Sequence, residues 1–238
     1  MQIQLVFSTD MLNLPFSYND KLQGLIYKII GDFNPVYSEA LHNRGKETNQ
    51  NLVKFFTFGR LKGDYRINKQ RNEIIFPKEA ALEIRSTDDL FVTNFLSGYR
   101  KGEMYKIGSN HVRLESCVLK NRIITSEEIT VFTNSPFVYK APYPEYKIFD
   151  AETARQKLLK NSIETWISAG NSAENFKLSI SFDGSKPKRV HSVFKGTSID
   201  AWKCSFKMSG NIETLNFFYN AGIGARTSQG YGMFEIED

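Results

Sequence analysis

The feature that most constrains the fold of this chain is an alternation of strand-like and helix-like segments that recurs in its second half. Residues 2–8 alternate apolar and polar side chains, as a strand with one buried face does. Residues 18–31 carry apolar side chains at the spacing of one helical stripe: Leu22, Leu25, Ile26, Ile29 and Ile30. We expect Asn19 or Asp20 to cap this helix and Gly31 to end it.

The rest of the first half completes one supersecondary unit. Residues 54–61 and 65–76 are rich in strand formers and are predicted to pair with each other, with Pro77 closing the second strand. A helix is expected to begin within residues 86–89, and residues 111–119 predict a last strand. The buried face of that helix is predicted as Phe91, Val92, Phe95, Leu96 and Tyr99. The order strand, helix, strand, strand, helix, strand is the ferredoxin-like unit.

The second half repeats this order. Strand-forming segments are predicted at residues 128–133, 137–139, 176–182, 188–194, 201–208 and 232–237, and helices at 151–169 and 212–219. The inward face of the first of these helices is predicted as Leu159, Ile163, Trp166 and Ile167. The predicted fold class is therefore α+β, with two tandem ferredoxin-like (βαββαβ, RRM-like) domains at residues 1–124 and 125–238 and antiparallel sheets. Two such sheets side by side form a long cleft suited to a polymer, and the RNA-recognition module shares this topology.

Composition adds a mild preference for polyanionic partners. Lys and Arg number 31 against 26 Asp and Glu, a net charge of +5. No basic leader with an apolar run and no stretch of about 20 apolar residues is found, so we expect a cytoplasmic protein without a membrane partner. Cys117 and Cys204 lie far apart without a CxxC companion, so we expect neither a disulfide framework nor a zinc site, and no metal or cofactor.

A glycine-rich segment lies near the C-terminus. Its glycines are spaced G-x-G-x5-G-x-G, at Gly222, Gly224, Gly230 and Gly232. The segment follows a predicted helix and opens a strand, the reverse of a dinucleotide-binding fingerprint, and no GK[ST] follows to form a P-loop. Glycines permit positive φ, so the loop could hold N–H groups against an RNA backbone, pack on the neighbouring domain, or be a plain turn.

These motifs carry a resemblance to a known family. A C-terminal helix, the motif GxGxxxSxGxG and a short last strand resemble the CRISPR-associated endoribonucleases that cut repeat RNA, members of the RAMP superfamily. The segments LQGLIYKII, ALH and KFFTF are similar to that family's first helix, catalytic histidine and second strand. One departure is Ala225 and Arg226, where family members commonly carry a Glu or Lys after the second glycine. The resemblance implies metal-independent cleavage of CRISPR precursor RNA through 2′-hydroxyl attack, a 2′,3′-cyclic phosphate product and an effector complex as a further partner.

His42 is the first catalytic candidate. Residues 35–45 predict a short helix whose Val36, Ala40 and Leu41 face the core, leaving His42 near the exposed end. Imidazole ordinarily titrates near neutrality, so a histidine can serve as general acid or base. A lone histidine on a helix is more often structural or solvated, and the catalytic role of His42 therefore depends on the family resemblance.

Two further candidates accompany the histidine. Tyr27 falls off the buried stripe of its helix, and the resemblance places its hydroxyl beside His42, where it could position or help deprotonate the nucleophile. Lys54 opens the KFFTF strand, where the family has a lysine that steadies the phosphate. Arg44 and Lys46 lie closer to His42 in sequence and remain alternatives for that role.

RNA binding is predicted on two segments. The first is a basic hairpin, and the second is the glycine-rich segment with Arg226 and Ser228; the hairpin residues are Lys186, Lys188, Arg189, His191 and Lys195. A solvated edge strand rich in Lys is the alternative for the hairpin. For the whole chain, a guide-RNA-binding subunit that does not cleave, and an unrelated two-domain protein that binds a small molecule, remain alternatives. Monomer and homodimer both stay open.

Overall fold

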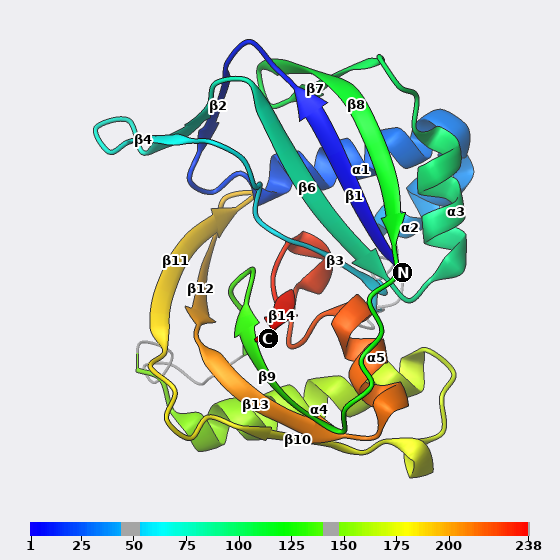
Figure 1. Cartoon of the computed structure of the whole chain (residues 1–238), viewed down its shortest axis with the longest axis vertical. Helices are drawn as coiled ribbons and strands as arrows, with labels where there is room; N and C mark the ends of the chain where they lie inside the picture. Colours follow the sequence, from blue (N-terminus) through cyan, green and yellow to red (C-terminus); the bar gives the residue numbers. More distant parts are fainter. Residues whose placement is uncertain (44–52, 140–147, 238) are drawn as a thin grey trace.

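The protein, seen here as a computed structural model that describes residues 1–43, 53–139 and 148–237, contains two antiparallel sheets, one above the other in Figure 1. The upper sheet has the order β3 (Phe56–Phe58), β6 (Glu79–Ser86), β1 (Gln2–Ser8), β8 (Asn110–Lys120) and β7 (Met104–Ile107). The lower sheet has the order β10 (Leu178–Ser181), β13 (Ser205–Gly210), β9 (Glu128–Thr133) and β14 (Phe234–Ile236).

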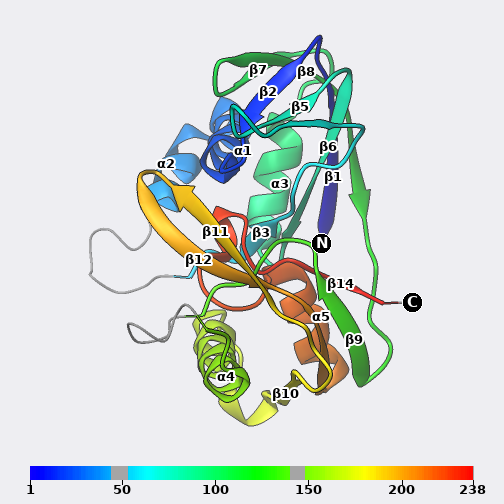
Figure 2. The ribbon, with the colours of Figure 1, turned by 90° about the vertical axis from the view of Figure 1, so that its left-hand side faces the viewer.

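Helices cover one face of each sheet (Figure 2). Behind the upper sheet are α1 (Asn19–Phe33), α2 (Pro35–Asn43) and α3 (Asp89–Gly98). Behind the lower sheet are α4 (Ala151–Ser168) and α5 (Ile212–Ala221), with the short 3₁₀ turn η2 (Ala173–Asn175) next to α4. A second 3₁₀ turn, η3 (Thr227–Gln229), lies against β3 and α1 of the upper half. Among the described residues, no helix is both long and apolar enough to cross a membrane.

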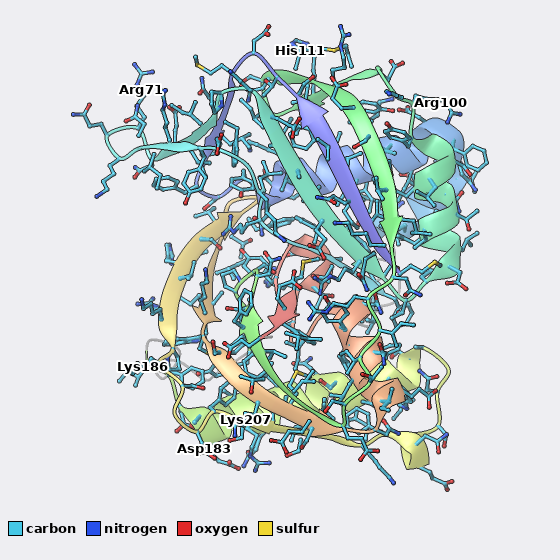
Figure 3. All side chains as sticks on the ribbon, in the orientation of Figure 1. Arg71, Arg100, His111, Asp183, Lys186 and Lys207 are labelled. Carbon is cyan, nitrogen blue, oxygen red and sulfur yellow. The ribbon has the colours of Figure 1, made fainter. Side chains whose placement is uncertain are left out.

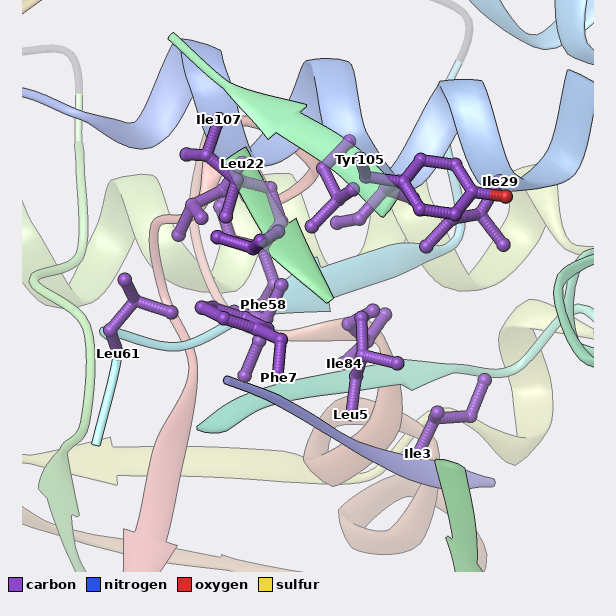
Figure 4. Packing of buried hydrophobic residues seen from close by; sticks show 14 of the residues in the cluster. Ile3, Leu5, Phe7, Leu22, Ile29, Phe58, Leu61, Ile84, Tyr105 and Ile107 are labelled. Carbon is purple, nitrogen blue, oxygen red and sulfur yellow. The ribbon is translucent and has the colours of Figure 1, made fainter. Parts of the chain in front are cut away.

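Each half has the ferredoxin-like topology. Numbered within its own βαββαβ unit, each sheet has the unit's four strands in the spatial order 2-3-1-4, with β7 as a fifth strand at the edge of the upper sheet, which confirms the predicted fold class. Each unit also has its own buried core. Figure 4 shows one of them, where Leu5 and Phe7 of β1 pack near Leu22 and Ile29 of α1. The division between residues 1–124 and 125–238 stays a proposal.

Two small sheets are added to the units. The strands β2 (Leu12–Pro15), β5 (Glu73–Phe76) and β4 (Arg66–Asn68) form a three-stranded sheet, and β11 (Lys188–Phe194) pairs with β12 (Thr197–Lys203) as a hairpin. In Figure 1 both additions lie on the left-hand side of the molecule.

The predicted pairing of residues 54–61 with 65–76 is wrong. Residues 65–76 form their own hairpin and pair with β2, while β3 pairs with β6 in the register Phe56 to Ser86. Strand β6 was not predicted because Pro77 resembled the end of the strand region. The alternate residues Ala80, Leu82 and Ile84 of β6 are nevertheless fully buried.

The predicted ends of the first helix are also wrong. Tyr18 is the N-cap of α1 and no side chain caps the helix, because the Asn19 amide instead binds carbonyls of the glycine-rich segment. The helix continues past Gly31 to Phe33. Gly31 allows α2 to approach α1, since a Cβ there would lie 3.3 Å from Ser38 Oγ.

Two helix faces differ from their predictions. In α2, Leu41 is buried as expected, but Val36 is 77% exposed and Ala40 is exposed too. In α4 the buried side chains are Ala154, Leu158, Ser162 and Trp166, while Ile167 is 49% exposed. Because three of the four predicted positions were each one residue too late, the true face is rotated by about 100°.

Candidate active site

Tyr27, His42 and Lys54 lie together in space. The Tyr27 and His42 rings meet edge to face, with centroids 5.6 Å apart. The Lys54 amine donates to the Tyr27 phenolic oxygen at 3.2 Å and to the His42 backbone carbonyl at 3.2 Å. Helix α1, the end of α2 and the segment entering β3 therefore place a phenol, an imidazole and an ammonium within one hydrogen-bonded group.

The packing of α2 on α1 determines where the imidazole lies. Asn34 begins α2 by accepting from the Tyr37 N–H, and Ser38 Oγ donates to the Tyr27 backbone carbonyl at 2.9 Å. His42 then falls at the exposed C-terminal end of the helix, where its Nδ1 lies 3.3 Å from Asn43 Oδ1. Arg44 and Lys46, the alternatives to Lys54, lie outside the described residues.

Tyr27 is a half-buried phenol. Its ring packs edge to face on Phe56, with centroids 6.2 Å apart, and the Lys54 amine lies 5.5 Å from its ring centroid. Burial raises the pKa of Tyr27 above its ordinary value, so the hydroxyl stays protonated at neutral pH. A protonated phenol can donate a hydrogen bond to a phosphate oxygen or orient a neighbour, and it is a poor base.

These residues line a cleft of about 990 Å³ between the two halves. The opposite wall comes from the second half and includes Gly222, Gly224, Arg226 and Ser228 of the glycine-rich segment and Lys195 of the basic hairpin. The structure thus brings together candidates that are up to about 200 residues apart in sequence. Two cations of α4, Lys157 and Lys160, also line the cleft, although the sequence did not predict them as RNA-binding residues. They belong to no motif, and only the orientation of α4 in the fold shows that they face the cleft.

The glycine-rich segment is fastened to α1 through its carbonyl groups. The Asn19 amide donates to the carbonyls of Gln229 at 2.9 Å and Gly230 at 3.0 Å. The Gln23 amide, one turn later, donates to the carbonyl of Ser228 at 2.7 Å. Tyr27 lies one further turn along the same face of α1, so one helix stripe holds both the loop and the catalytic candidates.

Each glycine of the segment has a packing reason. All four have positive φ, and an added Cβ would lie within 3.0 Å of the surrounding protein. The nearest atoms are Thr57 Cβ for Gly222, the Val138 carbonyl for Gly224, Phe58 Cε2 for Gly230 and the Ile223 carbonyl for Gly232. Gly222 and Gly230 therefore allow the segment to pack closely on the first half, whereas Gly224 and Gly232 allow close packing within the second half. Between these contacts, Arg226, Thr227 and Ser228 line the cleft with side chains.

The predicted hairpin residues fall into separate groups. Lys195, at the turn between β11 and β12, lies in the cleft. Arg189 and His191 both contact Asp200, at 2.8 and 3.2 Å. Lys186 is at the opposite end of the hairpin (Figure 3), beside Lys188 in sequence, and neither lines the cleft. The structure thus joins only Lys195 of this set to the catalytic candidates.

A buried cation fixes one half against the other. Arg85 of β6 is 1% exposed and donates to the Phe234 carbonyl at 2.7 Å and to the Glu235 carboxylate at 2.6 Å. Its guanidinium also lies 4.0 Å from the centroid of the Tyr219 ring. Because the cleft walls belong to different halves, this contact helps define the distance between them.

Comparison with known proteins agrees with this arrangement. Two family models match: CRISPR-associated protein Cas6, N-terminal, over residues 13–117, and CRISPR associated protein Cas6, C-terminal, over residues 119–236. A curated relative from Methanocaldococcus jannaschii, named CRISPR-associated endoribonuclease Cas6 1, is 27% identical over 249 residues, which cover 100% of this chain and 94% of the relative.

Solved structures share the whole fold. A Cas6-related protein from Pyrococcus furiosus matches with a TM-score of 0.79 and 21% identity, over 100% of this chain and 98% of the other. A structure described as a RAMP protein binding different RNA substrates matches with a TM-score of 0.77 and 20% identity, over 100% of both chains. With both halves matched by family models in the right order, the chain belongs to the Cas6 family of CRISPR-associated proteins.

Proposed function

We propose that this protein is a metal-independent endoribonuclease that cuts CRISPR repeat RNA within a precursor transcript to release guide RNAs. The observation that carries the proposal is the meeting of Tyr27, His42 and Lys54 in the cleft that the glycine-rich segment closes from the other side. The name of the Methanocaldococcus jannaschii relative, which is matched along nearly its whole length, supports the same activity.

Cleavage of the RNA requires two proton transfers and a positive charge that stabilises the transition state. The ribose 2′-hydroxyl loses its proton and attacks the adjacent phosphorus, the bond to the 5′-oxygen breaks, and that oxygen gains a proton. The products are a 2′,3′-cyclic phosphate and a 5′-hydroxyl. A base, an acid and a cation for the developing phosphorane charge are enough, and neither a metal nor a cofactor has to take part.

The three residues supply the cation, one of the two proton-transfer groups and the orientation of the substrate, and solvent water exchanges the second proton. His42 acts as general acid or base, because its exposed imidazole lines the cleft and has a ring nitrogen that can accept or donate a proton. Lys54 supplies the cation for the phosphorane oxygens. Tyr27, kept protonated by burial, orients the reacting groups and donates to a phosphate oxygen. In this assignment Tyr27 is not the base that deprotonates the nucleophile.

The wall of the cleft that belongs to the second half of the chain binds the RNA. Lys157, Lys160, Lys195 and Arg226 come from three different elements and add positive charge along the cleft, against the single carboxylate of Glu164 among its described lining. Delivery of the guide RNA to an effector complex in the cytoplasm completes the proposal.

The test is cleavage of end-labelled cognate repeat RNA in excess EDTA. We expect one cut per repeat, a product with a 2′,3′-cyclic phosphate, and no cut in RNA with a single 2′-deoxy nucleotide at the cleavage position. Tight binding without any cut would instead identify a guide-RNA-binding subunit. Cleavage that EDTA abolishes would refute the metal-independent mechanism.

A further inference from the structure

Positive charge is concentrated in two hairpin segments of this chain. Residues 60–78 contain six Lys and Arg against two carboxylates, and residues 186–207 contain six against one. The remainder then holds 19 cations and 23 carboxylates, a net charge of −4. Since the net charge of the whole chain is +5, whatever polyanion it binds should follow these two segments.

Three cations of the first segment are available to an outside ligand. Arg66, Lys69 and Arg71 are exposed, and within the described part of the chain no carboxylate lies within ion-pairing distance of any of them. Each segment also has a cation that is already paired, Lys62 with Glu83 in the first and Arg189 with Asp200 in the second. An unpaired cation gives up no internal partner when it binds a phosphate.

Part of the first segment projects from the protein. We call this part, the β4–β5 hairpin of residues 65–76, the finger. Figure 1 shows it extending from the upper left of the molecule, and Figure 3 shows Arg71 pointing away from the protein body. The finger is held firmly at its base, because β5 pairs with β2 along Leu12 to Pro15 and Phe76 is fully buried. Tyr65 packs against Phe76, with centroids 6.0 Å apart, yet remains 55% exposed.

The finger is connected to the catalytic cleft by a short path along the surface. Lys195 lines the cleft at the tip of the basic hairpin, and two residues before it the Val193 N–H donates to Ser17 Oγ at 3.0 Å. Next to Ser17, the carbonyl of Phe16 accepts from Arg60 at 3.2 Å, and Arg60 opens the segment that leads into the finger. Figure 2 shows the hairpin crossing the face that lies between α4 and the β2–β5 region.

We infer that the finger is a second RNA-contact surface, which binds the phosphate backbone of the precursor where the transcript leaves the catalytic cleft. Arg66, Lys69 and Arg71 contact phosphates, and the exposed ring of Tyr65 offers a stacking surface for a base. Such contacts tolerate any sequence, so the finger adds affinity and no base specificity. This inference rests on the proposed function, because it takes repeat RNA as the ligand.

The experiment compares two variants with the same change in charge. R66Q/K69Q/R71Q removes the finger cations, and R100Q/K101Q/K106Q removes three exposed cations from the opposite edge of the first half, where Figure 3 places Arg100. Both variants are checked for unchanged thermal unfolding. The dissociation constant for repeat RNA with flanking sequence is then measured at several KCl concentrations, and single-turnover cleavage is measured at saturating RNA.

The finger variant is expected to bind about tenfold more weakly near 0.1 M KCl. Its slope of log affinity against log salt should fall by about 2, since each phosphate contact on single-stranded RNA contributes roughly 0.7. The control variant should bind like wild type, and all three proteins should cleave at the same saturated rate. Equal loss of affinity in both variants, or wild-type binding by the finger variant, would overturn the inference. A wild-type protein that binds RNA without cutting it would refute the proposed function and leave the binding comparison intact.

Discussion

The amine of Lys54 donates a hydrogen bond to the phenolic oxygen of Tyr27 across 3.2 Å. The same amine donates to the backbone carbonyl of His42, so one cation joins three separate segments of the chain. Because burial raises the pKa of Tyr27, the phenol accepts this bond while keeping its own proton to donate. In the proposed mechanism the ammonium and the phenol both donate to a phosphate that binds beside His42.

Removing only the Tyr27 hydroxyl should slow the chemistry and spare the fold. In Tyr27→Phe the ring still packs on Phe56 and against the His42 ring, but one donor to the charged transition state is lost. A hydrogen bond to a charged group contributes about 1.5–3 kcal/mol, which corresponds to a roughly 10–150-fold slower single-turnover cleavage. The pH profile should keep its shape, because a phenol that stays protonated does not define either limb. A change in that shape, with binding unchanged, would show that Tyr27 is itself the acid or base.

Cleavage should depend on the positive charge of Lys54. Lys54→Gln is expected to reduce cleavage at saturating RNA by about 100-fold or more, since it removes the cation that faces the phosphorane. Lys54→Arg keeps the charge with a different donor geometry and should recover part of the rate. If the glutamine variant cleaved like wild type, the phosphate-stabilising role would pass to another cation of the cleft.

The glycine-rich segment should be sensitive to a methyl group where it meets the first half. In Gly230→Ala the new Cβ would lie 2.5 Å from Phe58 Cε2 and 2.7 Å from Asn19 Nδ2, at a φ of +80°. Gly184→Ala is the matched control, because Gly184 has a φ of +73° and nothing within 4 Å of the added atom. The control should lose about 1–2 kcal/mol from left-handed strain alone, or roughly 2–8 °C in Tm. The Gly230 variant should lose several degrees more, and equal losses in thermal unfolding would disprove the packing role.

The buried Arg85 should make stability depend on pH. Burial opposes ionisation of Glu235, but the charge of Arg85 outweighs it, and the pKa of Glu235 lies below its ordinary value. A carboxyl whose pKa is lowered by folding stabilises the protein above its unfolded pKa, near 4.3, and this contribution is lost as the pH falls through the folded pKa.

Arg85→Met tests this linkage. It removes the buried cation from Glu83 and Glu235, leaves them only the exposed Lys62 among their described ion-pair partners, and should cost about 3–5 kcal/mol at pH 7. In denaturant unfolding, the difference from wild type should shrink as the pH falls through the lowered pKa of Glu235. A difference that does not change with pH would mean that the cost is due to lost packing alone.

The sequence predicted most elements, and it predicted the three candidate residues Tyr27, His42 and Lys54 that the structure brings together. Strands such as residues 2–8 and 128–133 were found to the residue because polar and apolar side chains alternate along most of each strand. Three residues led to wrong predictions of where elements begin or end. Pro77 hid the strand that follows it, and Asn19 resembled a helix cap although its side chain binds the distant glycine-rich segment. Gly31 resembled a helix end although it lies inside α1 and lets α2 pack against that helix. Such tertiary contacts leave no local pattern, which is also why Lys157 and Lys160 escaped detection.

The most direct test of the account is single-turnover cleavage of repeat RNA in EDTA by His42→Ala. The matched control is His111→Ala, because His111 is exposed and away from the described lining of the cleft. We predict that His42→Ala binds RNA like wild type but cleaves at least about 100-fold more slowly, while the control cleaves normally. Wild-type cleavage by His42→Ala would contradict it.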